Sequence, residues 1–149
     1  MKAVSEADLI IVGIGSLYTS IIPNLLSNEM KKTLKKSKAK KMYICNIMSE
    51  HGETDGYNVS DCIKQINKYV DKNFIDIVLA NSKRVPSEIL KLYEEEFSSQ
   101  IMIDKENIQN LGVKLITADL LSLDNNQARH DPVKTALEVF TYLTRSDKK

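Results

Sequence analysis

The sequence is poor in the residues that mark several protein classes. It has no tryptophan, three prolines and five glycines in 149 residues, and no Gly- or Pro-rich linker interrupts it. Its two cysteines, Cys45 and Cys62, form no CxxC pair and show no zinc-ligand spacing with the two histidines. We therefore expect buried free thiols and a reducing compartment.

Long apolar runs and an excess of one charge are also absent. No apolar stretch approaches the roughly 18 residues that a membrane span needs, and the first eight residues lack the apolar core of a signal peptide. These absences predict a cytoplasmic protein. The net charge of +1 argues against nucleic acid as the main partner. We interpret the seven lysines between Lys31 and Lys41 as the solvated face and end of a helix.

Hydrophobic residues make up 42% of the chain, which is enough to form a core. Continuous runs rich in Ile and Val predict parallel strands over residues 9–12, 42–47, 75–80 and 113–117, with a weaker strand over 100–103. Helical spacing predicts helices over 20–36, with Pro23 in the first turn, and over 60–70, 86–97 and 132–143. This alternation predicts one α/β domain over 1–149, a three-layer αβα fold with a mostly parallel, Rossmann-like sheet and helices on both faces.

A glycine-containing loop, Gly13-Ile14-Gly15-Ser16, directly follows the first apolar run. Two glycines allow a sharp turn and a close approach to a ligand. A helix beginning near Thr19 or Ser20 would offer free N–H groups to a phosphate. The third glycine of the dinucleotide fingerprint is replaced by Tyr18, and no Walker A sequence follows. The alternative is an ordinary strand-to-helix turn with Ser or Thr caps.

Two further loops carry candidate ligand-binding residues. One follows the strand predicted over 42–47, and the other precedes the helix predicted over 132–143. Asn46 leads into a loop in which glycines flank Glu53 and Asp55, and these side chains could receive sugar hydroxyls, hold Mg²⁺ or simply form a solvated turn. Asp131 before Pro132 predicts a helix N-cap, and Arg129 and His130 just before it could meet a phosphate. Ligand sites in open α/β sheets form at the carboxyl ends of the strands.

The segments that contain these loops resemble the gluconeogenesis-factor family (YvcK-like), relatives of the 2-phospho-L-lactate transferases (CofD-like). Residues 13–26, GIGSLYTSIIPNLL, resemble the family's GPGSLYTSIxPNLL. Residues 43–57 resemble YxCNxMTQPGETDGY, and Ser60-Asp61, Asn81, Asp119-Leu120 and 129–132 match later positions in order. The family's proline is Ile14 here, and its TQP is Ser49-Glu50-His51.

The resemblance implies that this chain corresponds to the carboxyl half of such a protein. Family members are about twice as long and begin with a Gly-Gly-Gly-Thr-Gly turn that nothing here matches. The sheet is therefore expected to be incomplete, with an exposed edge through which copies could associate as a homo-oligomer.

The implied function is binding of a nucleotide or UDP-sugar by a regulatory protein that supports growth on gluconeogenic carbon sources, cell shape and cell-wall synthesis. No cofactor or metal-ligand set is assigned, although Mg²⁺ could accompany the ligand. The alternatives are a CofD-like transferase that moves a phospholactyl-type group from a nucleotide-diphosphate donor, and an inactive interaction module. The candidate ligand-binding residues are Gly13, Gly15, Ser16, Tyr18, Thr19, Ser20, Asn46, Glu53, Thr54, Asp55, Asn81, Arg129 and His130.

Overall fold

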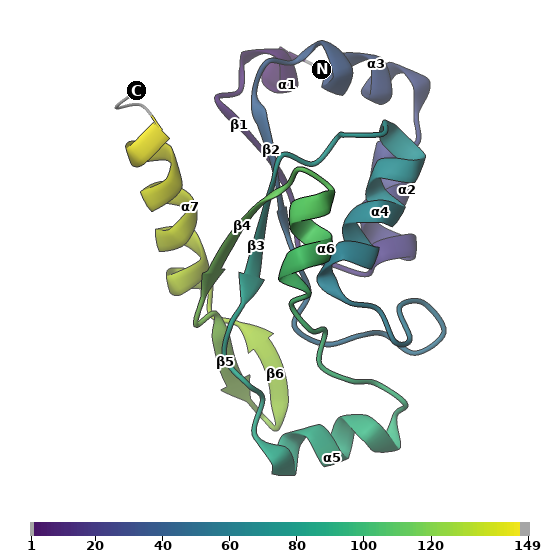
Figure 1. Cartoon of the computed structure of the whole chain (residues 1–149), viewed down its shortest axis with the longest axis vertical. Helices are drawn as coiled ribbons and strands as arrows, with labels where there is room; N and C mark the ends of the chain where they lie inside the picture. The colour runs from purple at the N-terminus through teal and green to yellow at the C-terminus, as the bar shows by residue number, and fades with distance from the viewer. Residues whose placement is uncertain (1, 147–149) are drawn as a thin grey trace.

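A four-stranded parallel sheet forms the centre of the molecule in the computed structural model, which describes residues 2–146. Its strands are β1 (Leu9–Val12), β2 (Lys40–Ile44), β3 (Ile77–Asn81) and β4 (Lys114–Ala118), which lie side by side in this order (Figure 1). The predicted α/β fold with a parallel sheet is thus confirmed. The second strand differs from the prediction because it begins at Lys40 and ends at Ile44 rather than Ile47.

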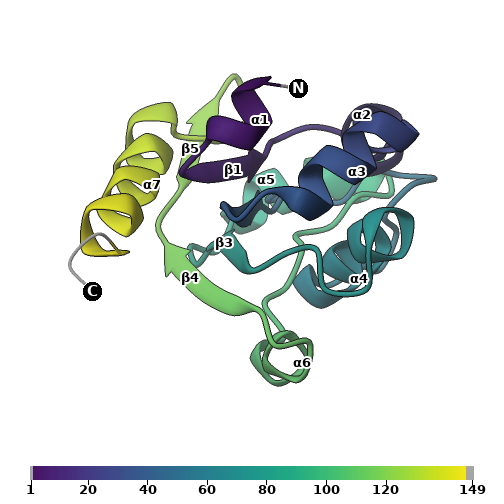
Figure 2. The same cartoon turned by 90° about the horizontal axis from the view of Figure 1, so that it is seen from above.

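The helices form two unequal layers. Because the strand order follows the chain order, right-handed crossovers place all connecting helices on the same face of the sheet. That face carries α2 (Ile22–Leu25), α4 (Val59–Val70) and α6 (Lys105–Asn110), whereas α7 (Pro132–Ser146) lies on the other face (Figures 1 and 2). The three-layer arrangement is therefore present, and one layer is much the thinner.

The segment after β1 corrects the prediction of one helix over 20–36. A π-helical turn, η1 (Leu17–Ile21), runs into α2, and a separate helix α3 (Asn28–Lys36) follows. The break occurs at Ser27, whose hydroxyl accepts the Met30 N–H at 3.1 Å and so begins a new helix. Apolar spacing alone did not reveal this corner, although Pro23 lies in the first turn of α2 as expected.

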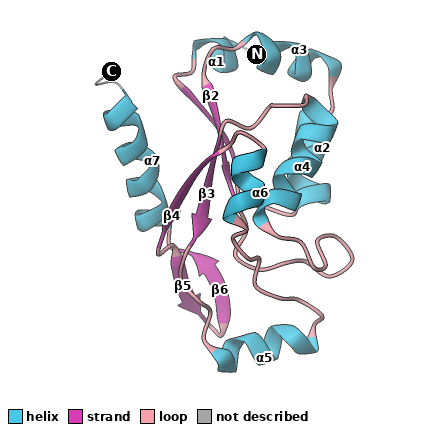
Figure 3. Ribbon diagram, in the orientation of Figure 1, coloured by secondary structure: helices cyan, strands magenta, loops and turns pink. Residues whose placement is uncertain are grey.

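Other elements also differ from the expectations. The strand predicted over 100–103 is wrong, since that segment forms only isolated bridges, from Gln100 to Met48 and from Met102 to Asn58. The helices α1 (Lys2–Glu6) and α6 were not predicted. Neither was the antiparallel hairpin of β5 (Leu121–Asp124) and β6 (Gln127–His130), which extends beyond the carboxyl ends of the sheet (Figure 3). The helix predicted over 86–97 is α5 (Ser87–Glu95).

Apolar side chains bury both faces of the sheet. On the crossover face Tyr43 and Val78 pack with Ile63 and Ile66 of α4, all at most 1% exposed. On the other face Leu79 packs with Val139 of α7. Cys45 and Cys62 are buried free thiols, as the sequence predicted. Among the described helices, none combines the length and the apolar character that crossing a membrane requires.

Candidate functional site

A pocket of about 620 Å³ lies at the carboxyl ends of β1 and β2. It is bounded by the loop after β1, the loop after β2, one residue of α5 and the last residues of β6. Its lining residues are Ile14, Gly15, Ser16, Ser20, Asn46, Ile47, Met48, Ser49, Glu50, Tyr93, Ala128, Arg129 and His130. Six of the thirteen candidate residues from the sequence are thus brought together: Gly15, Ser16, Ser20, Asn46, Arg129 and His130.

Two carboxylates from the loop after β2 lie against the loop after β1. The Ser16 hydroxyl donates to Glu50 Oε1 at 2.7 Å, and the Tyr18 backbone N–H donates to Glu53 Oε2 at 3.2 Å. The Asn46 amide donates to the Gly15 carbonyl at 2.9 Å. The Glu53 carboxylate therefore accepts one of the helix-start N–H groups that the sequence predicted would bind a phosphate.

The other acidic-loop candidates shape that loop and do not line the pocket. Thr54 is buried, and its hydroxyl accepts the Glu50 backbone N–H at 2.8 Å. Asp55 accepts the Gly52 N–H at 2.8 Å and contacts the His51 ring at 3.1 Å. The Gly52 bond and, second to it, His51 hold the pKa of Asp55 below its ordinary value. The loop thus satisfies these side chains internally.

Asn46 contributes a buried acceptor to the pocket wall. Its Oδ1 atom is inaccessible to solvent and accepts no hydrogen bond from residues 2–146. A buried carbonyl oxygen without a partner is costly, so this atom lowers the stability of the pocket wall. Since Asn46 also donates to Gly15, its side chain links that acceptor to the loop after β1.

The β5–β6 hairpin brings Arg129 and His130 to the pocket wall. Its turn uses Asn125 and Asn126, both with positive φ (47° and 62°), which is the conformation of a type I′ hairpin turn. The Arg129 side chain is exposed, and its guanidinium donates to the Gln127 amide oxygen. Arg129 is therefore a cation held at the rim by its own strand.

His130 is a neutral residue of the wall. Its Nε2 lies 3.1 Å from the Cys45 carbonyl, which can only accept, so Nε2 carries the proton. Burial lowers the pKa of His130 below its ordinary value, and the bond to Cys45 only partly opposes this effect. His130 thus ties β6 to the end of β2, and Arg129 supplies the positive charge.

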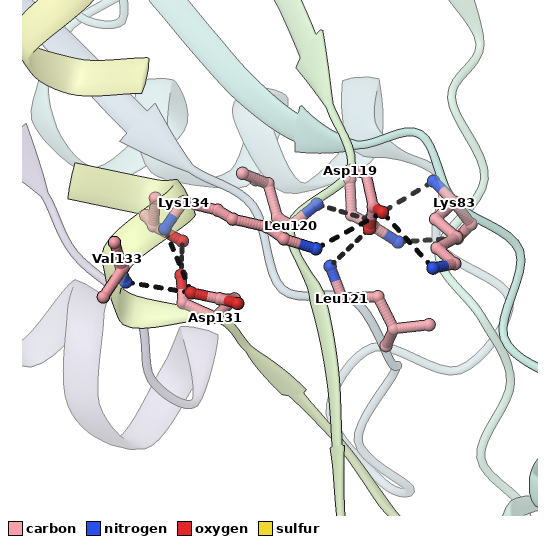
Figure 4. Close-up of polar contacts among 9 residues, drawn as sticks. Lys83, Asp119, Leu120, Leu121, Asp131, Val133 and Lys134 are labelled. Atoms are coloured by element: carbon pink, nitrogen blue, oxygen red, sulfur yellow. Dashed lines mark hydrogen bonds and ion pairs between the residues drawn. The ribbon is translucent and has the colours of Figure 1, made fainter. Parts of the chain in front are cut away.

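A polar cluster holds this hairpin against the sheet (Figure 4). Asp119 Oδ2 lies 3.3 Å from both Lys83 Nζ and Lys134 Nζ, and its Oδ1 accepts the Leu121 N–H at 3.2 Å. Desolvation raises the pKa of Asp119, but the two lysines and the Leu121 N–H together outweigh it and hold this pKa below its ordinary value. At the start of α7, Asp131 accepts two backbone N–H groups, which confirms it as the N-cap.

Asn81 belongs to the same support. Its Oδ1 accepts the N–H groups of Leu120 at 3.1 Å and Lys83 at 3.3 Å, and its Nδ2 donates to the Lys83 carbonyl at 2.7 Å. The side chain is buried and does not line the pocket. The structure therefore gives this candidate a role in joining β3 to the segment that leads into β5.

The remaining candidates lie beside the pocket. Gly13 and Thr19 are exposed and outside its lining, and the Tyr18 hydroxyl pairs with that of Tyr57 at 2.9 Å. Burial is the main cause that raises the pKa of Tyr18. Among the described residues no group of three or more His, Cys, Asp or Glu side chains is arranged to hold a metal ion.

Sequence reasoning missed Glu50 and Tyr93 as lining residues. Glu50 stands in the segment where the sequence departs from the family pattern, which was the available signal. Tyr93 comes from α5, and its hydroxyl accepts the Ala128 N–H at 3.0 Å, a contact between segments 35 residues apart. No local pattern indicates that contact.

Comparison with known proteins identifies relatives of the chain. A family model described as 2-phospho-L-lactate transferase CofD matches residues 1–121. The gluconeogenesis factor of Bacillus subtilis is 42% identical over 136 residues, which cover 91% of this chain and 43% of that protein. The gluconeogenesis factor of Listeria innocua is 45% identical over 136 residues, which cover 91% of this chain and 41% of that protein.

A solved structure has the same fold. The crystal structure of a Bacillus halodurans protein, described as a member of the UPF0052 family, superposes with a TM-score of 0.89 at 33% identity. The match covers 92% of this chain and 44% of that one. This chain therefore spans less than half the length of these relatives.

Proposed function

Because the chain belongs to the 2-phospho-L-lactate transferase CofD family and its relatives include gluconeogenesis factors, we propose that its pocket binds a nucleotide sugar in a regulatory role. The process served is growth on gluconeogenic carbon sources, together with cell shape and cell-wall synthesis. A UDP-sugar is the proposed ligand, and Mg²⁺ accompanies its diphosphate.

The observation that supports this proposal is that Glu50 and Arg129 both line one pocket. A carboxylate accepts hydrogen bonds from sugar or ribose hydroxyls, whereas a guanidinium binds phosphate oxygens. Because Glu53 already accepts a helix-start N–H, the diphosphate belongs on the Arg129 side. The hydroxyls then face Glu50.

A ligand titration tests the proposal. We would measure the thermal stability of this chain and of the Bacillus subtilis relative with UDP-N-acetylglucosamine, UDP-glucose, GDP and NADH, with and without Mg²⁺. A ligand at about 100 times its dissociation constant should stabilise the folded state by about 2.7 kcal/mol. An increase in the melting temperature of this chain with a UDP-sugar, and not with the other ligands, supports the proposal. If no ligand raises the melting temperature, the pocket of this chain does not bind these ligands by itself.

Charge variants sharpen the result. Arg129→Gln and Glu50→Gln each remove one charged hydrogen-bonding group, so each should raise the dissociation constant about 10- to 100-fold. Arg145→Gln and Glu94→Gln are the matched controls, because both residues are exposed and neither lines the pocket. If the pocket variants bind as tightly as their controls, the assigned contacts are wrong.

The second candidate is a transferase, which the description of the matching family model favours. In that case Arg129 would stabilise charge on a leaving nucleotide while an acceptor takes the transferred group. Release of a nucleoside monophosphate only when an acceptor is present would identify the transferase, and binding without release would favour the regulator.

A further inference from the structure

The outer edge of β1 and the neighbouring face of α7 form a continuous apolar surface. Among residues 2–146, β1 pairs with β2 on one side and with no strand on the other. Ile11 is 46% exposed in the middle of this edge strand, and Ile14 just beyond it is 53% exposed. An unpaired edge with apolar side chains is a surface that proteins normally cover.

The exposed face of α7 continues this surface. Val133, Leu137 and Phe140 are 75%, 61% and 65% exposed, and their spacing places them on one stripe of the helix. A groove of about 520 Å³ runs between α7 and β1, with Ile11 and Phe140 among its lining residues. We call Ile11, Ile14, Val133, Leu137 and Phe140 the β1–α7 surface.

The winding of the sheet accounts for this surface. All connections between β1 and β4 lie on one face, so they leave the other face to α7 alone (Figure 2). In a doubly wound sheet the second half winds the opposite way from the central strand, and its helices cover the opposite face. A half of that kind, added beyond β1, would bring helices onto the β1–α7 surface.

This surface is continuous with the candidate pocket. Ile14 and His130 line both the groove and the pocket, at the carboxyl end of β1. Ligand crevices of doubly wound sheets form where the winding reverses. A unit that paired with β1 would make β1 the strand at that reversal, and it would supply the missing wall of the pocket.

We propose that the β1–α7 surface docks a second α/β unit, which adds a parallel strand to β1 and packs a helix against α7. The unit has the size of the part of the relatives that this chain does not match, since the matches cover 41–44% of their lengths. This inference rests on the surface and the fold, and it does not depend on which ligand the pocket takes.

A second copy of this chain is the alternative occupant of the surface. Two copies hydrogen-bonded through their β1 edges around a two-fold axis would pair antiparallel, with that axis perpendicular to the sheet. Such an axis keeps each face on its own side, so the α7 helices of both copies would lie on one face beside the joined edges. An antiparallel pair of this kind would not reverse the winding at β1, so it would not form a ligand crevice at the pocket.

The test is association of this chain with the missing part of a relative. We would co-express residues 1–149 with the segment of the Bacillus subtilis gluconeogenesis factor that lies outside the match, without added nucleotide, so that failure here is distinct from failure of the ligand proposal. The expected result is a 1:1 complex by sedimentation, with the amides of residues 9–12 exchanging more slowly with solvent than in the chain alone.

Matched variants locate the interface. Phe140→Asp should raise the dissociation constant at least about 30-fold, because it puts a charge at the centre of an apolar contact. Phe97→Asp is the control, since Phe97 is 72% exposed and lies outside the surface; thermal unfolding of each variant shows that it folds. The proposal is overturned if no complex forms, if Phe140→Asp associates like the control, or if the chain alone dimerises through this surface.

Discussion

Replacement of Asn81 by alanine separates a supporting role from a ligand-binding one. The side chain makes three hydrogen bonds, and its loss leaves the Leu120 N–H buried without an acceptor. An unsatisfied buried donor costs about 1–3 kcal/mol, and each lost bond to Lys83 costs about 0.5–1.5 kcal/mol. Asn81→Ala should therefore lower the free energy of unfolding by about 3 kcal/mol.

Urea denaturation at pH 7 measures this loss, and the melting temperature should fall by about 10 °C. The matched control is Asn24→Ala, which removes one exposed hydrogen bond, from Asn24 Nδ2 to the Ser20 carbonyl, and should change stability by less than about 0.5 kcal/mol. If Asn81→Ala is as stable as Asn24→Ala, the supporting role is refuted. Lost ligand binding at unchanged stability would instead return Asn81 to the candidate ligand residues.

Two further outcomes follow from single side chains. Burial lowers the folded-state pKa of His130, so the unfolded chain binds more protons than the folded chain below about pH 6.5. The contribution of neutral His130 to the free energy of unfolding is therefore fully present above that pH. It is lost as the pH falls through the folded-state pKa. His130→Gln, which can still donate to Cys45, should flatten this decline in urea titrations between pH 7.5 and 5.5; an unchanged slope would contradict the assignment. Phe97 has a φ of 57°, a strained backbone conformation that glycine adopts freely, so Phe97→Gly should raise the free energy of unfolding by about 1 kcal/mol. The Phe97 ring also contacts the His51 ring, with 5.0 Å between the centroids. A loss of stability in the variant would show that this contact outweighs the backbone strain.

The parallel sheet was predictable because burial on both faces leaves a direct trace in sequence. Strands such as β3 must be apolar at nearly every position, and Ile77–Asn81 is buried throughout. The cap at Asp131 was predictable because its hydrogen bonds reach only two and three residues along the chain. Local chemistry decides both features.

The hairpin carried a signal that apolar periodicity does not detect. Asn125 and Asn126 are residues that tolerate positive φ, and two such residues in succession favour a type I′ turn. The strands on either side are four residues long and bury only Leu121, so they lack a run of Ile and Val. Turn chemistry would have found β5 and β6, and with them the strand that carries Arg129.

The position of Glu53 shows why the site was only partly predictable. Local sequence correctly indicated a loop after β1 and a helix beginning within a few residues of it, and both features favour an anion at the helix start. The bond from the Tyr18 N–H to Glu53 joins segments 35 residues apart, and it puts a carboxylate of this chain on one of those N–H groups. A phosphate at the start of η1 would compete with Glu53 for the Tyr18 N–H and would be repelled by Glu50. A phosphate at Arg129 would be attracted by the guanidinium charge. The charge of the distant loop therefore favours a diphosphate beside Arg129, a preference that no pattern within residues 13–20 could encode.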